Sequence, residues 1–305
     1  MTTVASHDHM IIDDCVDKFT TYLKDVKMSS SNTVDAYVRD LRNFREFCHS
    51  ESIDEPATVT ADELSGFKTY LAHKGLSVAS VSRSMSAVRS LYQFLVENGV
   101  VDFNPARMVP NDKCEKKGPQ VLTSKEISLL LSQPSTGDVK GIRDKAMLEV
   151  LYATGIKVSE LIALDVTDVN LKLSFIRCGG NGKERFIPLY PLAVKAVSDY
   201  LELSRKLLIV SKDEQALFVN VSGERMSRQG FWKIIKTYAQ QAQIHKPITP
   251  HTIRHSFAAH LLENGADIHD IQEILGHADL SSTQRYAHFL KERMQASYMK
   301  FHPRA

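Results

Sequence analysis

The chain has 305 residues, of which 43% are hydrophobic and 24% are charged, and its formal net charge is +2. This length is enough for two ordinary domains, and the composition excludes a disordered or fibrous protein. No apolar run is long enough to cross a bilayer, and the acidic N-terminus does not read as a signal peptide. We therefore expect a cytoplasmic protein that does not bind a membrane.

Charge is distributed unevenly along the chain. Residues 1–110 hold 11 Lys and Arg against 15 Asp and Glu, whereas residues 111–305 hold 27 against 21. A basic second part favours a phosphate-backbone ligand. The four cysteines form no Cys-x-x-Cys pair, so neither a zinc ribbon nor a disulfide framework is indicated.

The first part of the chain predicts helices only. Apolar residues at helical spacing, caps and breakers predict helices over 10–26, over 33–49, from 60 onward and over about 77–98. The third of these opens with a capping box made by Thr60 and Glu63. We expect a helical bundle over 1–105, followed by a linker over 106–120 that contains Pro, Gly and Lys.

The second part, 121–305, opens with a capping box at Thr123. Further helices are expected at about 138–153, 158–163, 191–207, 228–241, 251–263, 268–275 and 292–301. The segments 171–178 and 184–189 alternate and flank a glycine-rich turn, which predicts a β-hairpin, and 216–219 is a candidate third strand. The predicted fold is mainly α with a small antiparallel β-sheet.

Four residues near the C-terminus carry the most specific chemistry: His251, Arg254, His277 and Tyr286. A guanidinium donates paired hydrogen bonds to phosphate oxygens, so an arginine beside two histidines suits a pentavalent phosphate. A tyrosine at the end of this array is a candidate covalent nucleophile. The pattern indicates phosphoryl transfer on a nucleic acid without a metal or other cofactor.

Simpler interpretations exist for each of these residues taken singly. His251 and His255 are four apart, but the glutamate of a zinc His-Glu-x-x-His motif is missing and Arg254 would repel a cation, so no metal site is expected. His277 alone would be read as a helix-end cation, and Tyr286 alone as a packing aromatic. Only the ordered set favours catalysis.

The ordered set resembles the tyrosine recombinases, or phage integrases, and among them the Xer-type recombinases. The resemblance covers nearly the whole chain and depends on the runs Tyr152-Ala153-Thr154-Gly155-Ile156, Val158-Ser159-Glu160-Leu161, Lys183-Glu184-Arg185-Phe186-Ile187-Pro188-Leu189, His251-Thr252-Ile253-Arg254-His255, Leu275-Gly276-His277 and Tyr286-Ala287-His288.

The resemblance implies a helical core-binding domain and a catalytic domain that clamp double-stranded DNA. Tyr286 would attack the scissile phosphate and form a 3′-phosphotyrosyl link, so neither ATP nor a metal is needed. Arg254 would hold the developing charge, and His251 and His277 would bind the phosphate or take the tyrosine proton. The tail from Lys291 would dock on a neighbouring protomer in a tetramer on two DNA sites, with a second recombinase or an activating protein as further partners.

Two positions depart from the family pattern. Lys157 stands where the family has its first catalytic arginine, and a lysine keeps the charge but loses the planar fork. The hairpin is one residue short and keeps only Lys183 as the proton donor to the leaving oxygen. A catalytically impaired architectural protein is therefore an alternative to an active site-specific recombinase. A relaxing activity like that of type IB topoisomerases is a further alternative, because it shares the nucleophile and the phosphate chemistry. Chromosome dimer resolution and integration or excision of a mobile element are both compatible roles.

In the first domain, the fourth predicted helix is the better candidate for DNA contacts. Its candidate DNA-binding residues are Ser80, Arg83, Ser84 and Arg89. The arginines at 39, 42 and 45 on the second helix are equally compatible with a solvated face. Glu160 is expected to pair with a neighbouring cation rather than react, and His260 to have a structural role.

Overall fold

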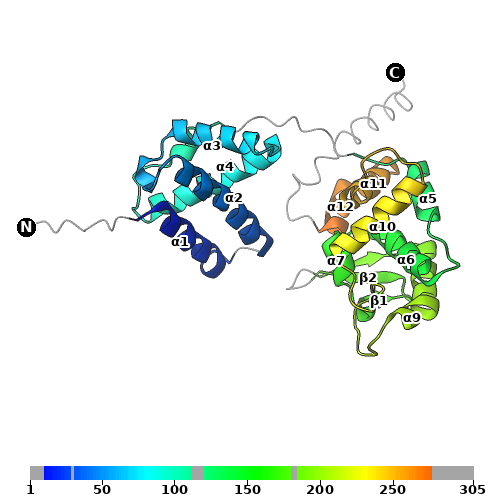
Figure 1. Ribbon diagram of the computed structural model, residues 1–305. Helices are drawn as coiled ribbons and strands as arrows, with labels where there is room; N and C mark the ends of the chain where they lie inside the picture. The colour runs from blue at the N-terminus through cyan, green and yellow to red at the C-terminus, as the bar shows by residue number, and fades with distance from the viewer. Residues whose placement is uncertain (1–9, 29–30, 111–119, 180–183, 277–305) are drawn as a thin grey trace, which may run out of the picture. The chain divides into compact units, whose positions relative to one another are not determined.

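The computed structural model describes residues 10–28, 31–110, 120–179 and 184–276. The chain divides into two compact units, 1–116 and 117–305, and each is described by itself (Figure 1). The fold is mainly helical with a small antiparallel sheet, as predicted.

The first unit is built from α1 (Ile12–Asp25), α2 (Ser31–Ser50), α3 (Ala61–His73) and α4 (Val78–Glu97), with short 3-10 turns at Pro56–Thr58 and Pro105–Arg107. The capping box at the start of α3 forms as predicted, because the Thr60 side chain accepts from the Glu63 amide. Aromatic rings fill the centre, with Phe44 edge-on to both Phe67 and Tyr92. The predicted helical bundle is therefore present.

Residues 106–110 pack on this bundle, although the sequence places them in the linker. Ala106 and Val109 are buried with the core of the first unit. Arg89 on α4 donates to both of their carbonyl oxygens, at 3.1 and 3.2 Å. The predicted boundary at 105 is thus too early, because a side chain in α4 satisfies backbone acceptors that a linker would leave to water.

The helical elements of the second unit are α5 (Ser124–Ser132), α6 (Val139–Thr154), α7 (Val158–Ala163), the 3-10 turn Val166–Asp168, α8 (Pro191–Asp199), the π-helical segment Tyr200–Arg205, α9 (Lys206–Leu208), α10 (Arg228–Gln241), α11 (Pro250–Glu263) and α12 (Ile268–Leu275). Helix α6 is buried along most of its length and packs against α8 and α11. It forms the centre on which the other elements are placed.

The sheet has the order β1 (Val169–Asn170), β2 (Phe175–Cys178) and β3 (Arg185–Pro188), and both pairings are antiparallel. The predicted hairpin is confirmed, with Cys178 opposite Arg185 at its open end. The predicted third strand at 216–219 is wrong, since Ala216 and Val219 make only isolated bridges. The third strand is β1 instead, which lies just before the segment 171–178 that was predicted as one strand. A turn with Ser174 at φ 54° shortens that segment to β2.

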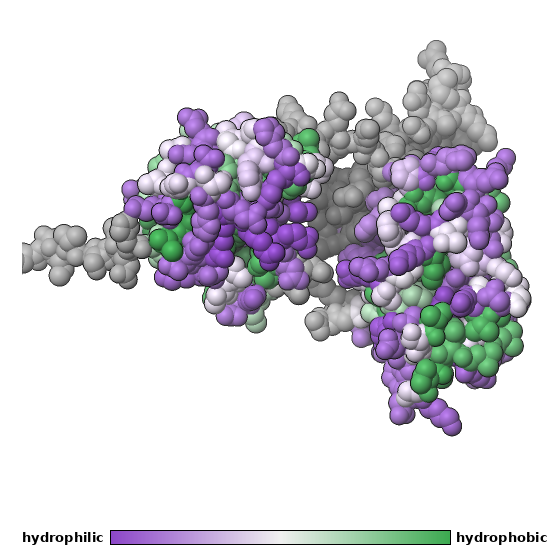
Figure 2. Space-filling view, viewed as in Figure 1, coloured by the Kyte–Doolittle hydropathy of each residue, from purple (hydrophilic) through white to green (hydrophobic). Residues whose placement is uncertain are grey.

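Among the described residues, no helix is long and apolar enough to span a membrane. The face of the first unit seen in Figure 2 is largely hydrophilic. An apolar area lies low on the second unit in the same view. The exposed apolar side chains of this unit include Leu203, Leu207 and Val210.

Candidate active site and DNA-binding surface

Arg254 is held inside the second unit by the ends of two other helices. It lies on α11 and is only 4% exposed. Its guanidinium donates through Nη1 to the carbonyl of Gly155 and through Nη2 to that of Leu275, the latter at 2.8 Å. These carbonyls lie at the C-terminal ends of α6 and α12, where the helix dipole favours a cation. The side chain is therefore fixed before any ligand binds.

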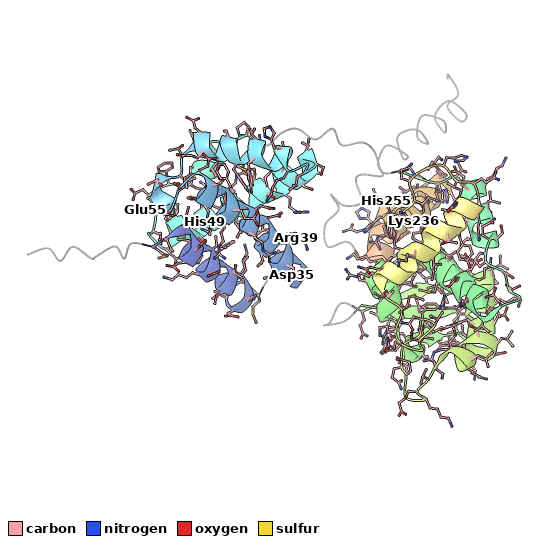
Figure 3. The ribbon with its side chains drawn as sticks, in the orientation of Figure 1. Asp35, Arg39, His49, Glu55, Lys236 and His255 are labelled. Atoms are coloured by element: carbon pink, nitrogen blue, oxygen red, sulfur yellow. The ribbon has the colours of Figure 1, made fainter. Side chains whose placement is uncertain are left out.

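His251 lies on the same helix, one turn before Arg254. The N-terminus of α11 is capped by Thr249, whose hydroxyl accepts from the Thr252 amide at 3.2 Å, so His251 sits in the first turn and is exposed. Residues three apart share a helix face. His255, labelled in Figure 3, is half-buried, and its ring centroid lies 6.4 Å from that of His251. Within the described residues, no cluster of three potential metal ligands is found.

Lys157 is exposed and lies directly before α7, as its N-cap residue. It follows Gly155, whose left-handed conformation at φ 58° ends α6 and whose carbonyl Arg254 binds. The Lys157 amide donates to Oε2 of Glu160 at 2.7 Å, which caps the first turn of α7. The backbone segment that carries Lys157 is therefore tied directly to the Arg254 guanidinium.

Glu160 pairs with Arg185 on β3, as the sequence predicts for a neighbouring cation. The two side chains form a fork at 3.1 and 3.0 Å. Burial raises the pKa of this carboxyl, but the hydrogen bonds from Arg185 and from the Lys157 amide outweigh it and hold the pKa below its usual value. Glu160 is ionised and already bonded at neutral pH, which suits support rather than proton transfer.

His260 has the structural role expected of it. Its Nδ1 lies 2.9 Å from the Tyr152 hydroxyl and its Nε2 lies 2.9 Å from the Leu122 carbonyl. The neighbouring Ser256 hydroxyl accepts from the Leu122 amide at 2.8 Å. The segment that leads into α5 is thus fastened to α11.

Several predicted features lie outside the described residues. These are Lys183, His277, Tyr286, Cys114 and the expected helix over 292–301. Of the six predicted catalytic residues, the structure brings together the chain segments of Lys157, His251 and Arg254, and it describes Gly276, which precedes His277.

One predicted DNA-binding residue of α4, Ser84, requires a correction. Ser84 is fully buried and its hydroxyl donates to Oδ1 of Asp40 at 2.9 Å, so it has no surface with which to contact DNA. Arg83 donates a fork to the same carboxylate at 2.8 and 2.9 Å, although its side chain is 48% exposed. Asp40 is only 1% exposed. The buried Asp40 on α2 therefore explains why Ser84 points inward, which a helical sequence pattern cannot reveal, whereas the exposed Arg83 stays a predicted DNA contact.

The other two predicted residues of this helix also have structural contacts. Ser80 is half-buried in the first turn of α4, where its amide donates to the capping Ser77 hydroxyl at 3.3 Å. Arg89 is half-buried and supports the segment 106–110, as described above.

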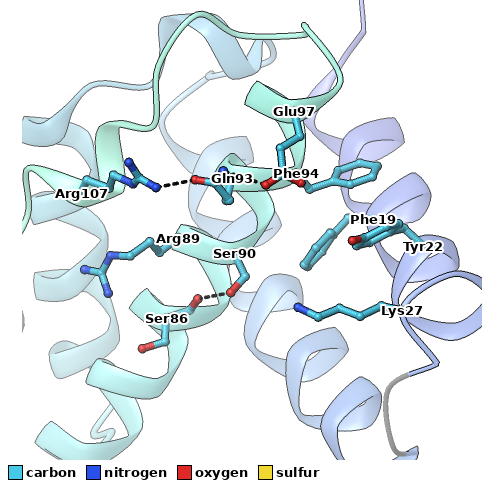
Figure 4. A pocket seen from close by; sticks show the side chains of 10 residues that line it. All are labelled: Phe19, Tyr22, Lys27, Ser86, Arg89, Ser90, Gln93, Phe94, Glu97 and Arg107. Atoms are coloured by element: carbon cyan, nitrogen blue, oxygen red, sulfur yellow. Dashed lines mark hydrogen bonds between the residues drawn. The ribbon is translucent and has the colours of Figure 1, made fainter.

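A hollow between α1 and α4 was not predicted from the sequence (Figure 4). It has a volume of about 420 Å³, and its lining includes Ser86 and Ser90 on α4, whose hydroxyls donate to the carbonyls of Ser82 and Ser86. Lys27 lines the hollow on one side and Arg107 on the opposite side (Figure 4). The four-residue spacing of the serines was a usable signal, but the cations come from other parts of the chain.

A second surface that the sequence did not predict is α10. This helix carries Arg228, Lys233 and Lys236 on exposed positions and has no acidic residue. The Lys236 ammonium, labelled in Figure 3, lies 4.0 Å from the centre of the exposed Trp232 ring. The absence of Asp and Glu over 14 residues was visible in the sequence and marks a basic face.

The chain is similar to known proteins over almost all of its length. Residues 120–293 match the phage integrase family, and residues 16–99 match the phage integrase N-terminal SAM-like domain. The tyrosine recombinase XerD of Halalkalibacterium halodurans is 42% identical, covering 96% of this chain and 99% of that protein. XerD of Listeria innocua is also 42% identical, covering 96% of this chain and 100% of that protein.

Solved structures share the fold. The XerH site-specific recombinase bound to a palindromic difH substrate in a post-cleavage complex has a TM-score of 0.76 at 22% identity, with coverage of 93% of this chain and 83% of that chain. A lambda integrase dimer bound to a core site has a TM-score of 0.72 at 15% identity, with coverage of 90% and 97%. At these identities the likeness shows the fold alone.

Proposed function

This chain belongs to the phage integrase family, and we propose that Tyr286 is the nucleophile with which it cleaves and rejoins double-stranded DNA. The chain is a site-specific tyrosine recombinase of the Xer type. The comparisons give no support to a catalytically impaired paralogue. The observation that carries the proposal is the buried Arg254, whose guanidinium is fixed by the carbonyls of Gly155 and Leu275.

The proposed cleavage step is a direct displacement at phosphorus. The Tyr286 oxygen forms a bond to phosphorus, the bond to the 5′-oxygen breaks, and the tyrosine proton passes to His251 or His277. Lys183 supplies a proton to the leaving 5′-oxygen. Arg254 and Lys157 stabilise the charge on the non-bridging oxygens, and a guanidinium that is already fixed does this without reorganisation. Ligation is the reverse reaction with a new 5′-hydroxyl.

We assign the DNA contacts to both units. In the first unit the hollow between α1 and α4 offers Ser86, Ser90 and Lys27, and in the second unit α10 offers Lys233 and Lys236. Hydroxyls and cations are the groups that contact phosphates. Replacing Lys27 or Lys233 by alanine should weaken binding for all sequences and lower the slope of log affinity against log salt by about 1 for each phosphate that is no longer neutralised. Lys195, paired with Asp199 at 2.6 Å on α8, is a control whose replacement should leave the slope unchanged.

Assembly and cellular role complete the proposal. The tail from Lys291 is proposed to dock on a neighbouring protomer, giving a homo- or hetero-tetramer on two DNA sites. Chromosome dimer resolution and movement of an integrated element use the same chemistry. Relaxation of supercoiled DNA that lacks any preferred site would identify the topoisomerase-like activity instead.

The test is covalent trapping on a nicked duplex that carries a chromosomal dimer-resolution-type site and loses its 5′ fragment after cleavage. The wild-type chain should form an adduct that survives denaturation, and Tyr286→Phe should form none. Lys157→Arg should cleave at least as fast as the wild type, because it restores the planar fork. A duplex that is bound by the wild type without any adduct, also after Lys157→Arg, would refute the proposal.

A further inference from the structure

We propose that Arg185 is a positioning residue for DNA cleavage, one that holds together the three chain segments from which Lys157, Lys183 and His277 extend. This inference rests on the proposed function and names a residue that takes no part in the chemical step itself. Arg185 opens β3, two residues after Lys183, and its side chain is 14% exposed.

One side of the Arg185 guanidinium faces α7. Its Nη1 and Nη2 donate to Oε1 and Oε2 of Glu160, and Oε2 of Glu160 also accepts from the Lys157 amide. The carboxylate is thus a bridge between the two residues. A change in the position of Arg185 is passed on to the backbone that carries Lys157.

The other side of the guanidinium faces the C-terminal end of α12. Its Nε donates to the carbonyl of Ile274 at 2.8 Å. The next carbonyl, that of Leu275, accepts from Arg254 at 2.8 Å. Two arginines therefore bind consecutive carbonyls at the point where the chain turns toward His277.

Gly276 lies directly against this guanidinium. A Cβ at this position would lie 2.9 Å from Cζ of Arg185, and the residue has φ 63°, a region that disfavours side chains. Gly276, which precedes His277 in the sequence, therefore lies against the Arg185 guanidinium. Lysine has neither this plane nor the number of fixed donors needed to reach Glu160 and Ile274 together.

A comparison within the same sheet separates positioning from general stabilisation. Arg177 on β2 makes a similar ion pair, with Nη2 donating to Asp168 at 2.8 Å, but this pair reaches no segment that carries a candidate catalytic residue. Arg177→Gln is therefore the matched control for Arg185→Gln. Each substitution removes one arginine from the sheet and leaves one acidic residue without its ion pair to that arginine.

The experiment measures single-turnover cleavage of the nicked duplex at saturating protein, together with the Kd for the same DNA. Arg185→Gln is expected to slow cleavage by about 100-fold, the effect of a displacement of catalytic groups by about 1 Å, with Kd changed by less than about 3-fold. Arg185→Lys should recover only part of the rate, and Arg177→Gln should cleave like the wild type.

A double-mutant cycle tests the contact with Gly276. Gly276→Ala alone should slow cleavage, and in the Arg185→Gln background it should add less than it does alone, because the guanidinium that its Cβ meets is gone while the left-handed backbone strain remains. A general loss of stability would make the two effects independent. Cleavage by Arg185→Gln at the wild-type rate, or fully additive effects, would overturn the inference, whereas failure of the wild type to form an adduct would overturn the proposed function instead.

Discussion

Replacing Gly155 by alanine should damage both the stability of the second unit and the placement of Arg254. Gly155 ends α6 at φ 58°, so any side chain there is strained. The added Cβ would also lie 2.3 Å from Cδ1 of Phe257 and 3.0 Å from Cδ2 of Leu275, both of which are buried. Phe257 cannot move away without disturbing α11, the helix that carries Arg254.

The expected loss combines two terms. A left-handed alanine costs about 1–2 kcal/mol and overpacking of a core costs about 1–3 kcal/mol, so the free energy of unfolding should fall by about 2–5 kcal/mol. Trp232 is the only tryptophan and lies in this unit, so urea unfolding followed by its fluorescence measures the effect. Gly137→Ala is the control, because its Cβ would meet only the Ser135 hydroxyl at 3.5 Å. A loss for Gly155→Ala of about 1 kcal/mol or less, with normal cleavage, would refute the steric argument.

Three further predictions concern buried polar groups. Asp40→Ala removes the acceptor of the buried Ser84 hydroxyl and should lower the stability of the first unit by about 2–4 kcal/mol, as measured by hydrogen exchange of its amides; unchanged exchange would contradict this. The lowered pKa of Glu160 means that its ionised form stabilises the folded state above its ordinary pKa of 4.5, and that this contribution is lost as pH falls below that value. The melting temperature of Glu160→Gln should therefore fall less steeply with acidification than that of the wild type, and parallel curves would argue against the pairing. Burial raises the pKa of three thiols, to about 11 for Cys15 and about 12 for Cys48 and Cys178. In a Cys114→Ser variant no thiol should react with a disulfide reagent at neutral pH until the chain unfolds, and fast labelling of the native chain would show that these sites open.

Local signals made the helices predictable. The bounds of α7, α10 and α12 agree with those expected, because caps and breakers such as Ser227 before α10 and Gly276 after α12 act within one turn of the chain. The capping boxes at Thr60 and Thr123 are present for the same reason. Helix ends are set by groups that are close in sequence.

The predictions that failed concern residues whose hydrogen-bond partners lie far away in the sequence. Ser84 was predicted as a phosphate contact, but it is buried against Asp40, which is more than forty positions away in the sequence. The segment 106–110 looked like a linker, and it is held by Arg89 from the preceding helix. In the candidate site the sequence pattern named Arg254, but the two carbonyls that fix its guanidinium come from α6 and α12 and could not be inferred from spacing. Whether a side chain is buried, and which group accepts its hydrogen bonds, is decided by contacts between residues that are far apart in the sequence.

The attachment of α12 has a consequence for how the protein loses activity. A helix of eight residues is too short to persist alone in water. The buried residues of α12, Ile271 and Leu275, belong to a small cluster with Phe257 and Leu262, and only the partly buried Ile274 also packs against the main core. The carbonyls of its last two residues accept hydrogen bonds from Arg185 and Arg254. Such a segment opens at a lower free energy than the unit around it. On warming, α12 should detach first, which would remove one of the two carbonyls that hold the Arg254 guanidinium while the core beneath stays folded, so that cleavage ends below the melting temperature of the unit.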